Sequence, residues 1–295
     1  MKETEQPKII VLGIDGLEYN LAKKWRLKNM MQKKYSKLDL SDYKIVVTPP
    51  IWGSMITGKI DKEIMNLWIK YGKLIGDNEK LEEKKWAEVL KKVIPKKIGT
   101  WIWDNLFTPT LGGDPFDTTA NFVKDKKYTT VFDFFERPWD NGIPSYGRNV
   151  SAPEQRKLTE KAIEGDKKPY RKYILKQYTE DKLKLLNALG EKKYDFIFWY
   201  TPILDNIGHM DIGRPLTHMM KHYLEVNNFV GIIKEICPKS IIYIISDHGM
   251  EAMNNKKTSW GNHSDHAFFS SNNGETIDKP FQLYDLIIKH KSVKK

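Results

Sequence analysis

The chain has 295 residues, enough to bury a substantial core as one large domain. An apolar share of 40% and a charged share of 29% are ordinary for a globular protein. Its longest apolar runs, such as IIYIIS, fall far short of the roughly 20 residues of a membrane helix, which argues against a membrane partner. Cys237 is the only cysteine, so an internal disulfide is excluded. Because the amino-terminal stretch is also polar and lacks the apolar run of a secretory signal, we expect a cytoplasmic protein.

The net charge of +11 would suit a nucleic-acid partner. Lysine supplies most of this charge, however, and it is spread through segments that are expected to be helical. This distribution favours solvated lysine faces over a single binding stripe. It also provides a field that attracts anionic substrates in general.

Several continuous apolar runs end at a polar side chain. KIIVLGI (8–14) ends at Asp15-Gly16, as expected of a buried parallel strand that opens into a functional loop. Helical patterns lie between the runs, and this alternation predicts an α/β fold with a mainly parallel central sheet flanked by helices. The expected strands are 8–14, 97–103, 194–200 and 240–246, and the expected helices are 17–34, the run from 54, 79–92, 168–190 and 214–236.

Residues 105–167 differ in texture from the rest of the chain. They are rich in Pro, Gly, Asn and aromatic residues and show little periodicity. Since one long loop is unusual in a compact domain, we interpret them as an inserted cap with short elements within a single catalytic domain, 1–295. Changes in this cap, for example at Trp139, should alter substrate choice more than chemistry.

Three carboxylates and three histidines follow or adjoin the apolar runs. Asp205 and His209 are spaced i, i+4, so both face one way on a helical turn. Asp247 and His248 must lie in the turn after IIYIIS, which Gly249 permits. Each alone is often a cap, a turn or a packed histidine, but their joint placement indicates two metal sites. The candidate ligands are Asp15, Asp205, His209, Asp247, His248 and His263. Imidazole with carboxylate favours zinc, with manganese second.

Thr48 is the candidate nucleophile, because it follows the strand-like KIVV and precedes Pro49-Pro50 and a helical run. The structural alternative is a helix N-cap. The same position points a hydroxyl at the positive end of a helix, where an anion is favoured. Ser54 is the alternative nucleophile, although it lies further into the helix.

Other motifs give weaker support for a functional site. The segment 53–59 spells GxxxxGK, but Ile60 stands where a phosphate-binding loop has Ser or Thr, so a helix is expected instead. His218 and His222 suggest an exposed helical face, His266 either contacts substrate or packs, and His290 is expected in solvent. Trp52 and Trp260 flank site segments and are candidate pocket residues.

Assembled in order, these segments resemble the alkaline phosphatase superfamily, and within it the type I phosphodiesterase/nucleotide pyrophosphatase branch. The resemblance is carried by IDG, TPPIWGSMITGK, DxxxH, SDHGM and GxH, over roughly 1–60 and 190–290. It implies one zinc held by Asp15, Asp247, His248 and Thr48, and a second held by Asp205, His209 and His263. Two departures leave substrate choice open: Ile51 stands where members often have Asn, and TGK continues as IDKEIMNLWIKYGK.

The sequence therefore predicts a metal-dependent hydrolase of phosphoric esters, most simply a phosphodiesterase or nucleotide pyrophosphatase that acts through a covalent Thr48 intermediate and two metal ions. Its expected substrate is a small phosphate ester or nucleotide, with nucleic acid as a further candidate. A phosphomonoesterase would share every ligand. A sulfatase is disfavoured because no CxPxR-like motif occurs. A nucleic-acid-binding protein with a structural metal fits less well, since structural zinc favours cysteine-rich sets.

Overall fold

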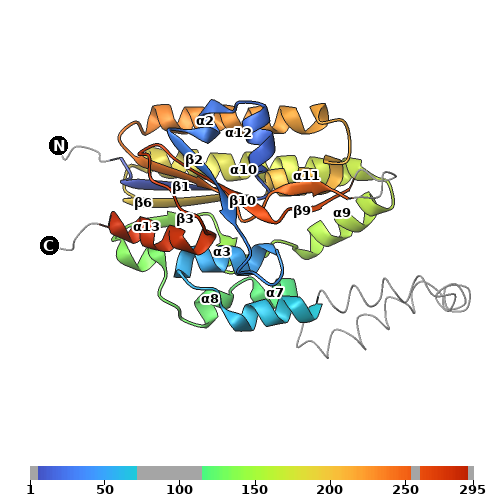
Figure 1. Ribbon diagram of the computed structural model, residues 1–295, viewed down its shortest axis with the longest axis horizontal. Helices are drawn as coiled ribbons and strands as arrows, with labels where there is room; N and C mark the ends of the chain where they lie inside the picture. Colours follow the sequence, from blue (N-terminus) through green and yellow to red (C-terminus); the bar gives the residue numbers. More distant parts are fainter. Residues whose placement is uncertain (1–5, 72–114, 254–259, 292–295) are drawn as a thin grey trace, which may run out of the picture.

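The computed structural model describes residues 6–71, 115–253 and 260–291. A six-stranded sheet in the order β2-β10-β7-β1-β6-β3 forms the centre of the described part (Figure 1). Strands β7, β1, β6 and β3 are parallel, whereas β10 runs antiparallel to β7 and β2, which confirms the mainly parallel α/β fold. The sheet strands are β1 (Ile9–Ile14), β2 (Lys34–Asp39), β3 (Pro138–Asp140), β6 (Phe196–Thr201), β7 (Ile241–Ile245) and β10 (His266–Ser271). Two small two-stranded sheets pair β4 (Ile143–Pro144) with β5 (Gly147–Arg148), and β8 (Met250–Ala252) with β9 (Gly261–His263).

Helices cover both faces of the sheet (Figure 1). Helices α2, α10 and α12 lie on one face, and α3 and α13 lie on the other. The helices whose two ends are described are α1 (Tyr19–Lys24), α2 (Lys28–Met31), α3 (Thr48–Thr57), α7 (Pro115–Thr119), α8 (Phe122–Asp125), α9 (Pro153–Ile163), α10 (Lys167–Glu191), α11 (Ile203–Asp211), α12 (Thr217–Ile236), α13 (Leu283–Lys289) and the short η3 (Val131–Phe134) and η4 (Pro280–Gln282). Residues 62–71 are helical as well. The expected helix 79–92 and strand 97–103 lie outside the described residues.

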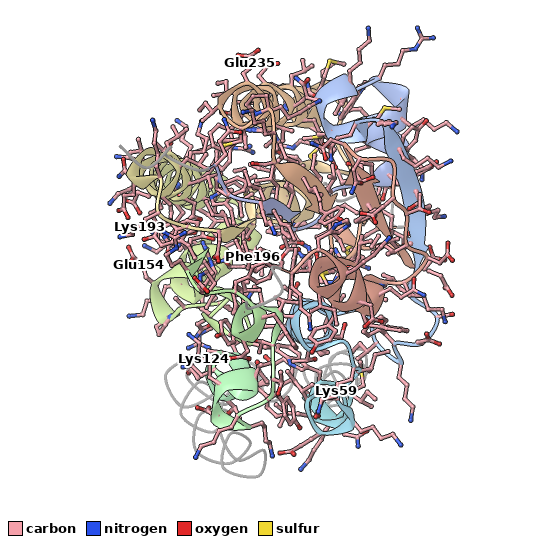
Figure 2. All side chains as sticks on the ribbon, turned by 90° about the vertical axis from the view of Figure 1, so that its left-hand side faces the viewer. Lys59, Lys124, Glu154, Lys193, Phe196 and Glu235 are labelled. Atoms are coloured by element: carbon pink, nitrogen blue, oxygen red, sulfur yellow. The ribbon has the colours of Figure 1, made fainter. Side chains whose placement is uncertain are left out.

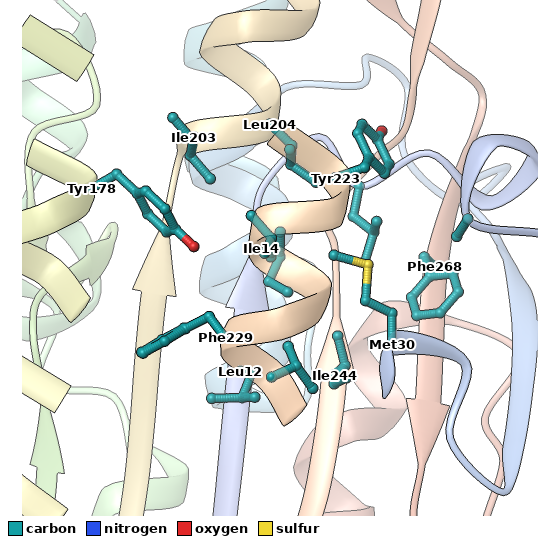
Figure 3. Close-up of a cluster of buried hydrophobic side chains, with 14 of the residues drawn as sticks. Leu12, Ile14, Met30, Tyr178, Ile203, Leu204, Tyr223, Phe229, Ile244 and Phe268 are labelled. Carbon is teal, nitrogen blue, oxygen red and sulfur yellow. The ribbon is translucent and has the colours of Figure 1, made fainter. Parts of the chain in front are cut away.

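Strand β1 is apolar throughout because both of its faces are buried. Leu12 and Ile14 belong to the core cluster beneath α10 and α12, which Figure 3 shows together with Phe229. Val11 points the other way, into the cluster that contains Trp52 of α3. The period-two alternation of a strand thus supplies two cores from one continuous run.

The expected helix 17–34 is wrong as a single element. Arg26 and Gln32 both have φ of 51°, a left-handed conformation that ends a helix. The chain therefore forms α1 and α2 and then turns into the edge strand β2. Because β2 pairs, among the described strands, with the sequence-distant β10, local patterning does not reveal it.

The segment 105–167 contributes to the sheet as well as to its surroundings. Trp139 lies in β3 and pairs with Ile197 of β6, so this residue is in the edge strand rather than above the sheet. Phe135 stacks on Phe196 with ring centroids 4.4 Å apart. The segment also contains α9, whose residues Gln155 and Thr159 line a pocket at the candidate site.

Lysines are distributed around the outline of the molecule. Lys59, Lys124 and Lys193 point outward at separate places in Figure 2, whereas Phe196 lies inside. Among the helices of the described residues, none combines the length and the apolar character that crossing a bilayer requires.

Candidate active site

Five candidate ligands come from three neighbouring parallel strands. Asp15 follows β1, and Asp247 and His248 follow β7. Helix α11 begins just after β6 and carries Asp205 and His209. Because β6, β1 and β7 are adjacent and parallel, the three loops open at the same edge of the sheet, where α/β folds bind ligands.

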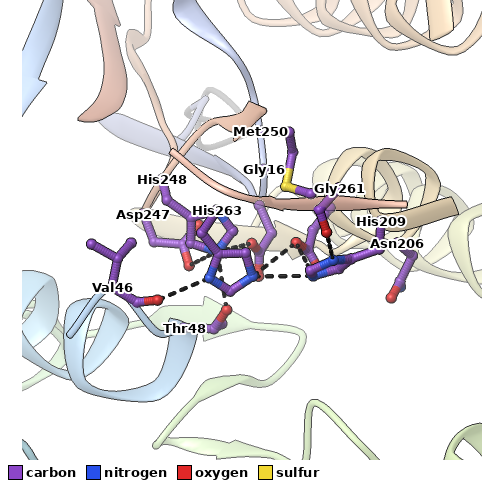
Figure 4. Close-up of polar contacts among 12 residues, drawn as sticks. Gly16, Val46, Thr48, Asn206, His209, Asp247, His248, Met250, Gly261 and His263 are labelled. Atoms are coloured by element: carbon purple, nitrogen blue, oxygen red, sulfur yellow. Dashed lines mark hydrogen bonds and ion pairs between the residues drawn. The ribbon is translucent and has the colours of Figure 1, made fainter. Parts of the chain in front are cut away.

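The first group consists of Asp15, Asp247 and His248, which are almost fully buried. Nε2 of His248 lies 3.1 Å from Oδ2 of Asp247 and 3.4 Å from Oδ1 of Asp15. The hydroxyl of Thr48 lies 3.3 Å from the same nitrogen (Figure 4). The predicted nucleophile and one predicted ligand set are therefore in contact.

The second group consists of Asp205, His209 and His263. Oδ1 of Asp205 lies 3.2 Å from Nε2 of His209 and 3.6 Å from Nε2 of His263. The two nitrogens are 3.1 Å apart. The rings of His263 and His248 stack with centroids 3.6 Å apart, so the two groups adjoin one another.

Each of the three imidazoles is held by a backbone carbonyl oxygen. Nδ1 of His209, of His263 and of His248 lies 2.9, 2.9 and 3.0 Å from such an oxygen. Since a carbonyl oxygen only accepts, Nδ1 carries a hydrogen in each ring, so that in the neutral form Nε2 presents its lone pair to the carboxylates. This tautomer is the one that metal-binding histidines adopt when a second contact fixes the ring.

When these side chains are unprotonated, their lone pairs converge within each group, and a proton or a metal ion is needed between them. Among the described residues, Oδ1 of Asp15 and Asp205 and both carboxylate oxygens of Asp247 have no hydrogen-bond partner although they are buried. Burial raises the pKa of Asp15 well above its usual range, and the charges of Asp247 and Asp205 raise it further. Burial lowers the pKa of His209, but the neighbouring Asp205 outweighs it and raises that pKa to about 9. The residues fit divalent ions, and their nitrogen and oxygen donors suit zinc or manganese.

The sequence profile of type I phosphodiesterase / nucleotide pyrophosphatase matches residues 9–268. The chain belongs to this family. Members are metal-dependent enzymes of the alkaline phosphatase superfamily that hydrolyse phosphoric esters, so the chain is a phosphoric ester hydrolase. The matched span includes Thr48 and all six candidate ligands. No curated protein sequence matches the chain.

In this phosphodiesterase-family chain, Thr48 is the first residue of α3, and Val47 occupies the N-cap position. The Thr48 hydroxyl therefore does not cap its own helix, and it lies at the positive end of a ten-residue helix. Ser54 is less suited to be the nucleophile, because its Oγ donates to the Ile51 carbonyl at 2.7 Å and lies 2.5 Å from the Tyr43 hydroxyl. Residues 53–57 of the GxxxxGK segment lie in α3, which ends before Gly58, whose φ is 72°, so the expected helix is confirmed there.

Sequence reasoning missed Glu18, which joins the loops of this family's site. Its Oε2 accepts from the backbone nitrogen of Met250 at 3.1 Å and from the Ser264 hydroxyl at 3.2 Å, while Oε1 lies 3.0 Å from Nε2 of His266. A Cβ at Gly249 would lie 2.0 Å from Oε2, so only glycine fits between them. Glu18 thus fastens the turn after β7 and the segment after His263 to the loop after β1. Its position three residues after Asp15 is the only local signal.

A pocket of about 290 Å³ opens over the two groups. None of the described residues that line it is Lys or Arg, despite the net charge of +11. Its lining residues are Asp15, Val47, Thr48, Pro49, Trp68, Phe116, Val150, Ser151, Gln155, Thr159, Tyr170, Tyr200, Pro202, Asp205, Asn206, His209 and His263. Those from Phe116 to Thr159 come from the segment that was expected to be a cap.

The remaining candidates lie apart from both ligand groups. His218 is exposed as expected, but His222 is buried, so the expectation of a shared exposed face is wrong for His222. The expectation of a solvated His290 is wrong as well, because its Nε2 lies 2.9 Å from Glu275. Trp52 is fully buried in the core, and the ammonium of Lys167 lies over the ring of Trp260.

Proposed function

We propose that this enzyme hydrolyses phosphodiester or nucleotide pyrophosphate bonds, with Thr48 as the nucleophile and the two carboxylate–histidine groups each holding a divalent ion, zinc in the first instance. The observation that carries this proposal is the buried Thr48 hydroxyl, 3.3 Å from His248 and at the start of α3, beside two adjoining ligand groups. Two such ions would supply stabilisation of the negative charge that develops on the phosphoryl oxygens.

The chain's own residues would position the reacting groups and carry out the displacement at phosphorus. Oγ of Thr48 forms a bond to phosphorus, the bond from phosphorus to the leaving oxygen breaks, and the hydroxyl hydrogen of Thr48 ends on the leaving alcohol. Water then cleaves the Thr48–phosphorus bond, which returns a hydrogen to Thr48 and releases the phosphoric product. The α3 amino terminus favours the negative charge on Oγ during attack.

The pocket lining favours a diester over a monoester. A phosphomonoester carries two negative charges near neutral pH, and a site that prefers it gains from an additional cationic side chain. A diester carries one charge and a second organic group. The described lining provides no Lys or Arg and does provide the aromatic rings of Trp68 and Phe116, 4.9 Å apart. This chemistry supports a phosphodiesterase or nucleotide pyrophosphatase before a phosphomonoesterase.

The test compares bis(4-nitrophenyl) phosphate, 4-nitrophenyl phosphate and a nucleoside 4-nitrophenyl diester, with protein stripped of metal and reloaded with zinc or manganese. We expect kcat/KM for the diesters to exceed that for the monoester by at least about tenfold, equivalent to about 1.4 kcal/mol in transition-state free energy. A monoester preference of that size would instead identify a phosphatase. Absence of hydrolysis of all three by fully loaded protein would contradict both assignments.

A further inference from the structure

Three neutral polar side chains meet at the wall of the pocket beside the Asp205 group. They come from three helices: Gln155 from α9, Tyr170 from α10 and Asn206 from α11. All three line the pocket and are at least nine-tenths buried. The Tyr170 hydroxyl donates to Oδ1 of Asn206 at 2.8 Å, and Nε2 of Gln155 lies 3.4 Å from the same oxygen.

The amide nitrogen of Asn206 is the unusual member of this cluster. It has no hydrogen-bond partner among the described residues, although Asn206 is only 4% exposed. A buried donor without an acceptor is unfavourable, and native proteins rarely retain one outside a functional site. Because the amide oxygen is held by Tyr170, the side chain is fixed, and its buried N–H groups at the pocket wall have no acceptor among the described residues.

The place of Asn206 relative to Thr48 assigns it to one side of the reaction. Thr48 contacts His248 of the first group, whereas Asn206 directly follows Asp205 of the second. In Figure 4, Thr48 lies below His248 and Asn206 lies beyond His209. In an in-line displacement the leaving oxygen departs on the side of phosphorus opposite the nucleophile. Asn206 is therefore on the leaving-group side.

We propose that Asn206, positioned by Tyr170 and Gln155, donates a hydrogen bond to a neutral oxygen on the leaving alcohol, and so selects diesters whose leaving group carries a carbonyl or hydroxyl oxygen. The inference rests on the proposed function, since it takes Thr48 as the nucleophile. None of the three side chains is charged at neutral pH, and the pKa of the Tyr170 hydroxyl is raised to about 12, mainly by burial. A neutral acceptor therefore matches the cluster better than a second phosphate.

The test uses aryl methyl phosphates, in which the phenol rather than methanol departs. One pair compares 3-acetylphenyl with 3-chlorophenyl methyl phosphate, and a second compares 4-acetylphenyl with 3,5-dichlorophenyl methyl phosphate. The two phenols in each pair have closely similar acidity, so the ratio of kcat/KM values reports recognition of the carbonyl oxygen. We expect the parent enzyme to prefer the acetyl ester of at least one pair by about three- to tenfold, the range for one neutral hydrogen bond.

Asn206→Leu, which keeps the shape and removes both N–H groups, should reduce this preference to about one, with the larger loss on the acetyl ester. Gln155→Leu should reduce it in part, by loosening Asn206. The matched control is Gln177→Leu, which removes another glutamine–tyrosine bond on α10, 2.8 Å to Tyr173, away from the pocket lining, and should leave the preference unchanged.

The outcomes separate the two proposals. If the parent hydrolyses none of the four diesters, the proposed function fails. If it hydrolyses them without preference, or if Asn206→Leu retains the preference, the leaving-group subsite alone is contradicted. Should Asn206→Leu fail to fold by circular dichroism, Gln155→Leu decides the question, because an unchanged preference in that variant also overturns the proposal.

Discussion

The hydroxyl of Tyr200 donates a hydrogen bond of 2.5 Å to Oδ2 of Asp15. Tyr200 lies in β6 and Asp15 directly follows β1. The register of these adjacent parallel strands, in which Gly13 lies opposite Tyr200, brings the two residues together. The Tyr200 ring is held edge-on against Trp52, with centroids 5.1 Å apart. The bond fixes one oxygen of Asp15, so that the other is directed toward His248.

We predict that Tyr200→Phe weakens binding of the ion at the Asp15 group while the fold is kept, because the ring contact with Trp52 remains. Loss of a hydrogen bond that orients a ligand lowers metal affinity by about 10- to 100-fold. Competition against a chromophoric chelator measures the change. The matched control is Tyr243→Phe in strand β7, which removes a hydroxyl that is hydrogen-bonded to Glu275. This variant should keep the parent affinity. Equal affinity in both variants would mean that Asp15 does not depend on Tyr200.

The two ligand groups predict about two divalent ions per chain. Elemental analysis after gentle purification should find zinc or manganese, and chelation should abolish activity. Asp247→Asn and His209→Ala should each lower the metal content and reduce activity by several orders of magnitude with the fold intact, since neither empties an apolar space. Full activity in chelator, or either variant within about threefold of the parent, would contradict the two-metal proposal.

Metal affinity should rise with pH up to about 9. In the metal-free protein Asp205 raises the pKa of His209 to about 9, so His209 holds a proton below that pH. An ion must displace this proton, which means that affinity falls as pH falls below 9 and levels off above it. Calorimetric titration of zinc in buffers with different ionisation enthalpies measures the proton released. Uptake without proton release between pH 6.5 and 9 would show that His209 is not displaced from a protonated state.

Thr48→Ala should bind metal and fold but lose nearly all turnover, whereas Thr48→Ser should keep a measurable fraction. Rapid quenching with a labelled diester should leave a phosphoryl group on Thr48 that mass spectrometry locates. Ser54→Ala removes the hydroxyl that contacts Tyr43 and the Ile51 carbonyl, and should cost about 1 kcal/mol of stability with turnover retained. A label on Ser54, or normal turnover by Thr48→Ala, would exclude Thr48 as the nucleophile.

Glu18→Gln should impair the site as well as the fold. The pair with His266 is mostly buried, so breaking it should cost about 2–3 kcal/mol, below the cost of a fully buried pair. Amide exchange at Met250 should speed up, because its backbone N–H donates to Glu18. Metal affinity should fall, because Met250 and Ser264, which both bond to Glu18, adjoin ligand-bearing segments. The control is Glu275→Gln, a residue that joins Tyr243, Asn273 and His290 away from the pocket. This control should lose stability alone, and loss of metal affinity in both variants would make Glu18 merely structural.

The sequence by itself determined the elements whose physical cause is local. A strand buried on both faces must be apolar along its whole length, so 8–14, 194–200 and 240–246 predicted β1, β6 and β7 closely. The i, i+4 spacing of Asp205 and His209 likewise predicted that they share a helical face, which they do on α11. Metal-binding residue types stand where parallel strands end, and this placement indicated a metal site at one edge of the sheet.

Only the tertiary structure decided which distant side chains complete that edge. Tyr200 and Asn206 carry no local signal, and Glu18 carries none beyond its place near Asp15. The partners that define the roles of Glu18 and Tyr200 lie 185 to 248 residues away, and those of Asn206 lie on helices α9 and α10. Strands β2 and β3 escaped prediction for the same reason, since each exists only through pairing with a remote strand. Local patterning follows from which face of an element is buried, whereas a pocket is defined by the atoms that separate elements bring to one point in space.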